Sequence, residues 1–249
     1  MTQRFENKRV IVTGGAAGFG EAISRRFASE GARVMVADIN TAGAEALAGE
    51  LDGAIPFTID VTDESQTEAM AAAAVDAWGG IDVLCCNAGL PHRIKGGMKL
   101  STEEFDFMWQ VNVRSIFFAA KYCTPHMPEG SAIVSTASIG GVRPRPGGLA
   151  YNTSKAAAIT LTRGLAMELA PKIRVCCVNP VSSPTGFDKV AVGTDELPEE
   201  MNQRVVDGIP MGRRALPSDV AGAVAYLASA DAEFLTGVAL DIDGGRSIG

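Results

Sequence analysis

The stretch KRVIVTGGAAGFGEAISRRFASEGARVMVADIN, residues 8–40, decides the fold. Its apolar run at 10–12 predicts a buried strand, and the glycine-rich turn at 13–20 leads into apolar residues that recur at helical spacing. Gly31 ends that helix, and a second apolar run ends at Asp38. Strand, turn, helix and strand in this order predict one βαβ unit and therefore a parallel sheet.

The glycine-rich turn predicts a binding site for a dinucleotide. Gly14, Gly18 and Gly20 allow the backbone to approach a pyrophosphate, whose charge the first N–H groups of the following helix stabilise. The spacing G-x-x-x-G-x-G differs from the general G-x-G-x-x-G pattern, so the flanking strand and helix carry this interpretation. The alternative is a tight structural turn.

Asp38 predicts which dinucleotide binds. It follows Gly20 by eighteen residues and ends the second strand. A carboxylate there accepts hydrogen bonds from the ribose hydroxyls and repels a 2′-phosphate. Because no Lys or Arg lies in the turn or directly after Asp38, we expect NAD rather than NADP.

The rest of the chain continues the alternation of strands and helices. We expect an α/β fold over residues 1–249, a single-domain Rossmann-like doubly wound sheet of about seven mostly parallel strands with helices on both faces. Further strands are expected near 33–37, 55–60, 81–86, 131–137, 173–178 and 236–242. Helices are expected near 41–51, 63–78, 102–127, 152–170 and 217–230. Residues 90–99 and 182–216 interrupt this rhythm and are expected to be substrate loops.

Tyr151 and Lys155 predict proton-transfer chemistry. A tyrosine hydroxyl has a pKa of ~10, so a catalytic tyrosine needs a cation close to its phenolate. On a helix, residues four apart lie on one face, so the Lys155 ammonium can reach Tyr151. Ser138 can then hydrogen-bond a developing oxyanion. The alternative is that Tyr151 and Lys155 only decorate a solvated helix face.

Seven motifs together resemble the short-chain dehydrogenase/reductase family, in the family's order and over nearly the whole chain. They are TGGAAGFG at 13–20, Asp60-Val61, Asn87-Ala88-Gly89, Asn112, Ser138, Tyr151-x-x-x-Lys155 and Asn179-Pro180. The resemblance implies that Tyr151 is the general acid/base, that Ser138 polarises the substrate oxygen and that Asn112 positions a water. It further implies that Lys155 lowers the pKa of the tyrosine and holds the nicotinamide ribose.

The resemblance also implies the residues that contact the cofactor. They are Gly14, Gly18, Phe19, Gly20, Asp38, Ile39, Asp60, Val61, Asn87, Ala88, Gly89, Tyr151, Lys155, Pro180 and Thr185. One position departs from the family pattern, because Val181 stands where glycine usually follows Pro180. A β-branched residue disfavours positive φ, so the family's backbone path at the nicotinamide end is not assumed for this chain.

The implied activity is the NAD(H)-dependent interconversion of a secondary alcohol and a ketone on a small molecule. The alternative is a catalytically silent dinucleotide-binding protein with a regulatory or scaffolding role. The substrate class stays open among secondary alcohols, sugars or polyols, steroid-like rings and 3-oxoacyl or 3-hydroxyacyl thioesters. Basic residues in two candidate loops, His92, Arg143 and Arg145, suggest an anionic or acyl-carrier-linked substrate. They are alternatively solvated charges or interface contacts.

Composition and charge limit the partners and the cellular compartment that we expect. A net charge of −7 gives no footprint for nucleic acid, and no apolar stretch is long enough to cross a membrane. The N-terminus lacks an apolar signal region, so the cytoplasm is expected. The five cysteines, including the adjacent pairs at 85–86 and 176–177, are expected to be buried thiols, and their spacing predicts no metal site.

The resemblance further implies a homotetramer. In family members, helices corresponding to 102–127 and 152–170 pair across subunits, and the C-terminal segment makes a further contact. Apolar residues on these two helices exceed what one sheet face needs. They include Phe117, Phe118, Ile159, Leu161 and Leu165. The alternative is that all of them are buried within a monomer.

Overall fold

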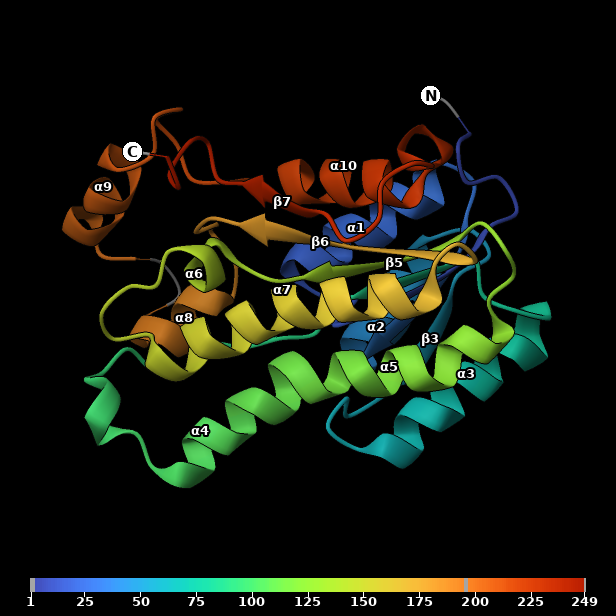
Figure 1. Ribbon diagram of the computed structural model, residues 1–249, viewed down its shortest axis with the longest axis horizontal. Helices are drawn as coiled ribbons and strands as arrows, with labels where there is room; N and C mark the ends of the chain where they lie inside the picture. The colour runs from blue at the N-terminus through green and yellow to red at the C-terminus, as the bar shows by residue number, and fades with distance from the viewer. Residues whose placement is uncertain (1–2, 195–196, 249) are drawn as a thin grey trace.

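A computed structural model describes residues 3–194 and 197–248 of the chain. Its core is one sheet of seven parallel strands in the order β3-β2-β1-β4-β5-β6-β7 (Figure 1). The strands are β1 (Arg9–Thr13), β2 (Arg33–Asp38), β3 (Ile55–Thr58), β4 (Val83–Cys86), β5 (Ser131–Thr136), β6 (Ile173–Pro180) and β7 (Ala239–Ile242). The predicted doubly wound sheet is confirmed, and every strand pair in it is parallel.

The strand order reverses between β1 and β4, which lie side by side. Connections after β1 lead to β2 and β3 on one side, and those after β4 lead to β5, β6 and β7 on the other. Ligands of such sheets bind in the crevice at the carboxyl ends of the strands where the order reverses. The fold therefore places a site beyond Thr13 and Cys86, where β1 and β4 end.

Helices cover both faces of the sheet. One face packs against α1 (Gly18–Ser29), α2 (Thr41–Glu50) and α10 (Pro217–Ala228), and the other against α3 (Glu64–Trp78), α5 (Ser115–Cys123) and α7 (Leu149–Leu169). Side chains of β1 alternate accordingly, because Val10 and Val12 join the first apolar cluster and Ile11 joins the second. All five cysteines are buried thiols, as predicted.

The expected helix over 102–127 is interrupted. The structure has α4 (Thr102–Trp109), a π-helical turn η2 (Gln110–Arg114), α5, and the 3₁₀ turn η3 (Thr124–His126). The wider turn carries Asn112, whose side chain is buried, and Ser115 Oγ donates to Val111 O within it. Such bulges occur often at functional sites, and apolar periodicity does not reveal them because the helix direction continues on either side.

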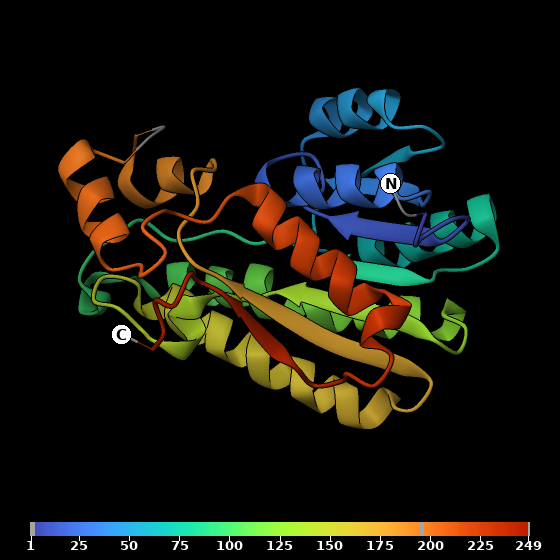
Figure 2. The same ribbon diagram turned by 90° about the horizontal axis from the view of Figure 1, so that it is seen from above.

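Two further segments contain helices that the sequence did not predict. Ser138 caps a short helix, α6 (Ile139–Val142), and the segment 182–216 holds α8 (Phe187–Val192) and α9 (Glu199–Asp207). Residues 195 and 196 of that segment lie outside the described residues. Seen from above, α8 and α9 lie beyond the carboxyl ends of the strands, at the same end as the C-terminal segment (Figure 2). The short turn η1 (Gly97–Lys99) precedes α4, and η4 (Ala230–Ala232) follows α10.

The association face predicted from apolar residues needs a correction. Phe118 and Ile159 are buried within the chain, and Leu161 and Leu165 pack partly against the second apolar cluster, since they face the sheet. Of the predicted set, Phe117 is exposed, at 48%. Other exposed aromatic residues of the same helical stretch are Phe105, Phe107 and Trp109.

Candidate active site

The glycine turn lies in close contact with the end of β4. Gly14 has a φ of +60° and Gly18 a φ of +55°, a conformation that favours glycine. A Cβ on Gly14 would lie 2.8 Å from the Cα of Ala88, and one on Gly20 would overlap the carbonyl oxygen of Gly14. A Cβ on Gly18 would lie 3.4 Å from the Cβ of Thr185. The segment after β4 at Ala88 and the segment after β6 at Thr185 therefore both meet the glycine turn.

The start of α1 has amide groups suited to an anion. Its N-cap, Ala17, has no side chain that can accept from the first N–H groups. Asp38 lies beside this turn and accepts hydrogen bonds from Ala16 N at 3.0 Å and Asn40 N at 2.9 Å. The backbone therefore fixes the orientation of the carboxylate at the end of β2. This arrangement fits a dinucleotide. The uncapped amides and the glycines with positive φ suit its pyrophosphate, and the Asp38 carboxylate suits its ribose.

Two threonines that the sequence analysis missed join the strands at this crevice. Thr13 Oγ1 accepts from the backbone N–H groups of Asn87 and Ala88, at 3.2 and 3.3 Å. Asn87 donates from Nδ2 to Gly14 O at 3.0 Å and accepts from Thr136 Oγ1 at 3.1 Å. Thr13 is the last residue of β1 and Thr136 is the last residue of β5. A threonine at the end of a parallel strand was the sequence signal for these contacts, because its hydroxyl can bridge to a neighbouring strand.

Lys155 and Asn112 converge over Gly89. A Cβ on Gly89 would lie 3.0 Å from Lys155 Nζ and 2.9 Å from Asn112 Oδ1. Asn112 is held by Leu90, whose N–H it accepts at 3.1 Å and whose carbonyl oxygen it donates to at 3.0 Å. Asn112 also donates to Ser154 Oγ at 3.0 Å, which ties the π-helical turn to α7.

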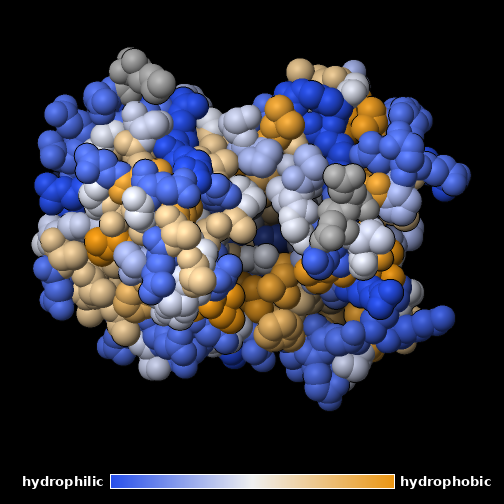
Figure 3. All heavy atoms as spheres, turned by 180° about the vertical axis from the view of Figure 1, so that it is seen from behind, coloured by the Kyte–Doolittle hydropathy of each residue, from blue (hydrophilic) through white to orange (hydrophobic). Residues whose placement is uncertain are grey.

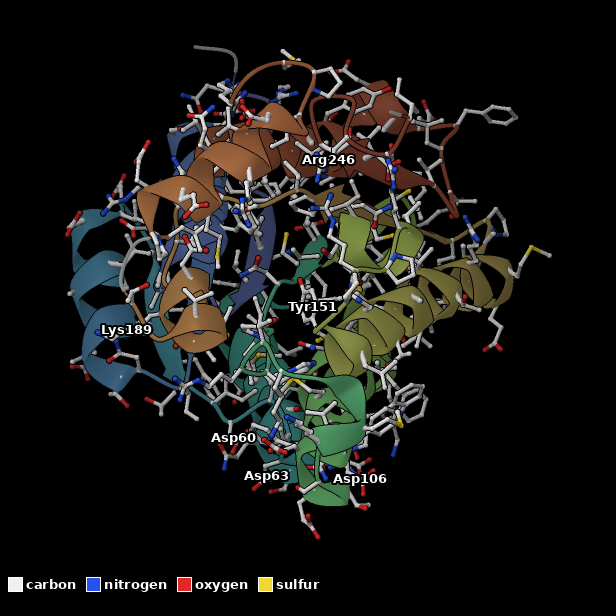
Figure 4. The ribbon with its side chains drawn as sticks, turned by 90° about the vertical axis from the view of Figure 1, so that its left-hand side faces the viewer. Asp60, Asp63, Asp106, Tyr151, Lys189 and Arg246 are labelled. Carbon is white, nitrogen blue, oxygen red and sulfur yellow. The ribbon has the colours of Figure 1, made fainter. Side chains whose placement is uncertain are left out.

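Ser138 and Tyr151 converge over Gly140. A Cβ on Gly140 would lie 3.4 Å from Ser138 Oγ and 3.5 Å from Tyr151 Cε1. Ser138 Oγ accepts from Gly140 N at 3.0 Å as the cap of α6, and Tyr151 lies in the first turn of α7. The structure therefore brings all four predicted catalytic residues to the carboxyl ends of the strands, where Figure 4 shows Tyr151 facing the viewer.

Burial dominates the proton equilibria of the pair. It raises the pKa of Tyr151 from 10.0 to about 12, although a hydrogen bond with Ser138 acts in the opposite direction. It lowers the pKa of Lys155 from 10.5 to about 8. Lys155 Nζ donates to Thr136 O at 2.8 Å and lies 5.8 Å from the centre of the Tyr151 ring. The expected net lowering of the tyrosine pKa is therefore not seen, because desolvation is the larger effect.

The remaining predicted cofactor residues lie around the same crevice. Asp60 accepts from both the N–H and the hydroxyl of Thr62, at 2.9 and 2.7 Å, and Val61 packs against the second apolar cluster. Ile39 is 69% exposed beside Asp38, and Phe19 packs partly against the first cluster. Their roles toward a cofactor stay predictions.

The departure at Val181 has a packing explanation. Its side chain joins a small buried cluster with Ile139, Ile209 and Ala215, and its N–H donates to Ile242 O at 3.0 Å. Its φ is not positive. The backbone after Pro180 therefore passes Val181 without positive φ, and Thr185 lies beside the glycine turn without the usual glycine.

The candidate substrate loops also meet. Ile94 N donates to Ala191 O at 2.9 Å, and Lys95 N donates to Gly147 O at 3.4 Å, so residues 90–99 contact both α8 and the segment after α6. His92 is 6% exposed, with Nδ1 2.7 Å from Arg93 O. Seen from behind, the surface is hollowed near its middle, between the α1–α2 region and the α8–α9 region, and apolar side chains line its lower edge (Figure 3).

Residues 3–194 and 197–248 contain no group of three or more His, Cys, Asp or Glu side chains that could hold a metal ion. Among the described helices, none is both long and apolar enough to span a bilayer.

Comparisons with known proteins agree with this geometry. A family model described as enoyl-(acyl carrier protein) reductase matches residues 14–247. A 4-formylbenzenesulfonate dehydrogenase of Comamonas testosteroni is 44% identical over 250 residues, 97% of this chain and 99% of its own. A crystal structure of 3-ketoacyl-(acyl-carrier-protein) reductase from Brucella melitensis, complexed with NADH, is 39% identical with a TM-score of 0.91, covering 98% of this chain and 100% of that one. A short chain dehydrogenase of Burkholderia cenocepacia, in complex with NADP, is 32% identical with a TM-score of 0.89, covering 98% and 99%.

Fold, site and comparisons define an oxidoreductase that binds a nicotinamide dinucleotide and acts on CH–OH groups or the corresponding carbonyl groups. The chain belongs to the short-chain dehydrogenase/reductase family.

The buried Lys155 predicts a stability cost that depends on pH. Its pKa is about 8 in the folded chain and 10.5 when exposed, so between these values the unfolded state binds the extra proton. The stability of the wild type should therefore rise with pH from about 8 to 10.5, by roughly 3 kcal/mol relative to a chain without this amine. At pH 7, Lys155→Met should accordingly unfold at a higher urea concentration than the wild type. The margin, which is the difference between the two midpoint concentrations, should shrink at pH 10.

Urea unfolding without added nucleotide measures this margin. Lys172→Met, which removes an exposed ammonium, is the control and should show no such trend. A margin for Lys155→Met that stays constant between pH 7 and pH 10 contradicts the prediction.

Proposed function

We propose that the protein is an NAD(H)-dependent oxidoreductase that interconverts an alcohol and a carbonyl group on a small molecule bearing an anionic group. The observation that carries this proposal is the convergence of Asn112 with Lys155 over Gly89, and of Ser138 with Tyr151 over Gly140, beside the glycine turn. The substrate named for the 44% identical relative combines an aldehyde with a sulfonate, which supports an anionic small molecule.

Tyr151 moves the proton in this proposal. With a pKa of about 12, its hydroxyl is protonated at neutral pH and can donate to a carbonyl oxygen during reduction. In the oxidative direction it has to become a phenolate, which the nearby ammonium of Lys155 stabilises. The bound nicotinamide would accept or supply the hydride.

The other polar residues prepare the site for this transfer. Ser138 Oγ, positioned as the cap of α6, donates a hydrogen bond to the substrate oxygen. The approach of Asn112 and Lys155 over the exposed Gly89, just after β4, supports a proton route at this place. A water held there by Asn112 would connect the ammonium to solvent, as the family resemblance implies.

Asp38 supports NAD over NADP. Each carboxylate oxygen accepts a hydrogen bond from one backbone N–H, that of Ala16 after β1 or that of Asn40 after β2. These two bonds hold the negative charge where the adenosine ribose is expected to bind. A 2′-phosphate placed there would meet this charge. The NADH complex of the 39% identical neighbour agrees with the proposal, whereas the NADP complex of the 32% identical neighbour shows that related chains differ.

Titration of cofactor fluorescence tests this preference without a substrate. NADH should bind at least tenfold more tightly than NADPH, which corresponds to about 1.4 kcal/mol. Asp38→Asn keeps one acceptor oxygen but removes the charge, so it should narrow the difference by weakening the repulsion of NADPH. Equal affinities in the wild type would refute the assignment.

Replacing the proton donor should separate binding from turnover. Tyr151→Phe should bind NADH within about threefold of the wild type yet lose turnover by ~10²–10⁴-fold, the usual contribution of a positioned acid or base. Tyr226→Phe is the matched control, because this residue lies on α10, which covers the sheet rather than the site. Rates are followed by nicotinamide absorbance with a panel of carbonyl compounds. Near-normal turnover of the Tyr151 variant would exclude it as the donor.

We further propose a homotetramer in which α4 and α5 contact a second subunit. Phe105, Phe107, Trp109 and Phe117 are each between 38% and 48% exposed on this stretch, and such apolar side chains mark association surfaces. Light scattering at micromolar protein should give four times the 25.9 kDa mass of the chain. Phe117→Glu should lower that mass without unfolding the subunit. A monomeric mass for the wild type would contradict the proposal.

A further inference from the structure

Three arginines from two segments gather at the carboxyl end of the sheet. Arg143 ends α6, Arg145 follows it, and Arg246 comes from the C-terminal segment after β7. Arg143 Nη1 donates to Arg246 O at 2.9 Å, which joins the two segments. Figure 4 shows Arg246 above Tyr151 at this end of the molecule. The three cations therefore lie on the same side of the fold as the proposed proton donor.

Arg145 is held in place by its backbone. Pro144 and Pro146 flank it, so its presentation costs less entropy than on a flexible loop. Its carbonyl oxygen accepts from Asn152 Nδ2 at 2.9 Å. Asn152 is buried and follows Tyr151 directly on α7. The position of Arg145 is thus coupled to the helix that carries the proton donor.

Arg246 is held by a turn of its own segment, and its guanidinium occupies the space that a side chain at position 208 would fill. The carboxylate of Asp243 accepts from Gly245 N at 2.9 Å and from Ser247 N at 2.6 Å, on either side of Arg246. The guanidinium lies over Gly208, where a Cβ would overlap its Nη1 atom. Gly208 has a φ of −91°, which any residue adopts, so its missing side chain serves this packing rather than the backbone.

Within residues 3–194 and 197–248, the charges of Arg145 and Arg246 lack acidic partners. Arginines elsewhere pair at short range, as Arg9 does with Asp82 at 2.6 Å and Arg214 with Asp188 at 2.7 Å. Among the residues that the structure describes, no carboxylate lies within salt-bridge distance of the Arg145 or Arg246 guanidinium. Partial burial and the charges of Arg246 and Arg143 lower the pKa of Arg145. An added anion would relieve this repulsion.

We infer that Arg145 and Arg246 bind the anionic group of the substrate, a sulfonate or carboxylate, while its carbonyl carbon lies at Ser138 and Tyr151. The inference rests on the proposed function and names the residues that recognise its substrate. Asn152, which donates to the Arg145 carbonyl oxygen, is the next residue after Tyr151, so Arg145 and the proton donor lie at the same end of α7. Planar guanidinium groups suit two-oxygen contacts with such an anion.

Gly208 is a positioning residue in this arrangement. Gly208→Ala is compatible with the backbone, yet its methyl group would displace the flexible end of Arg246. The fold should survive this change while the anion site loses one of its two cations. A merely structural role for Gly208 would change stability without changing which substrates are preferred.

The test compares 4-formylbenzenesulfonate with its neutral analogue 4-formylbenzenesulfonamide, both reduced with NADH. In the wild type, kcat/KM should favour the sulfonate at least tenfold. Arg145→Gln, Arg246→Gln and Gly208→Ala should each lower this ratio at least fivefold. Arg33→Gln removes an exposed charge at the opposite, amino end of β2 and should leave the ratio within twofold.

Calorimetric titration of benzenesulfonate into the NADH complex provides a readout apart from turnover, with affinity expected to fall in the same three variants and at high salt. If the sulfonamide reacts but the ratio is near one, or does not respond to the variants, the anion site is wrong, and the proposed interconversion of an alcohol and a carbonyl group stands without the anionic substrate. If neither aldehyde reacts, binding of benzenesulfonate that depends on Arg145 and Arg246 supports the site and counts against the proposed reaction. Absence of such binding overturns the site.

Discussion

The site depends on how closely the turn after β1 approaches the end of β4. This approach is possible because Gly14 and Gly20 have no side chains, so Asn87 can donate to the Gly14 carbonyl. From there the contacts continue without a break, since Asn87 accepts from Thr136, and the Thr136 carbonyl accepts from Lys155. The glycine turn and Lys155 are therefore held in register by one short chain of hydrogen bonds across neighbouring strands.

That register places an amine in an unfavourable environment. Lys155 is 4% exposed, and its pKa falls to about 8 because water is excluded around it. Burial raises the pKa of Tyr151 at the same time. Each shift disfavours the charged form of its own side chain. At neutral pH only the lysine shift costs stability, because Tyr151 is neutral in both the folded and the unfolded state. Such a cost is expected where a site is built for chemistry rather than for packing.

Much of this arrangement could be predicted from local patterns. The βαβ unit at 8–40 and the alternation beyond it fixed the sheet, and the spacing of Tyr151 and Lys155 placed both on one helix. The π-helical turn around Asn112 escaped prediction because apolar residues continue on both sides of it and no local residue pattern marks a single π-helical turn. Arg246 escaped for another reason, since it meets Arg143 across a separation of 103 residues that only the tertiary fold brings together.

We propose that Tyr151 and its neighbours support hydride exchange between a nicotinamide and a carbonyl carbon. The most direct measurement is to incubate the protein with NADH deuterated at C4 and a panel of carbonyl compounds, and to locate the label by NMR. The account predicts deuterium on the carbinol carbon of at least one product with the wild type. Labelled NADH that stays unconsumed across aldehydes, ketones and thioesters, despite binding to the protein, would contradict it.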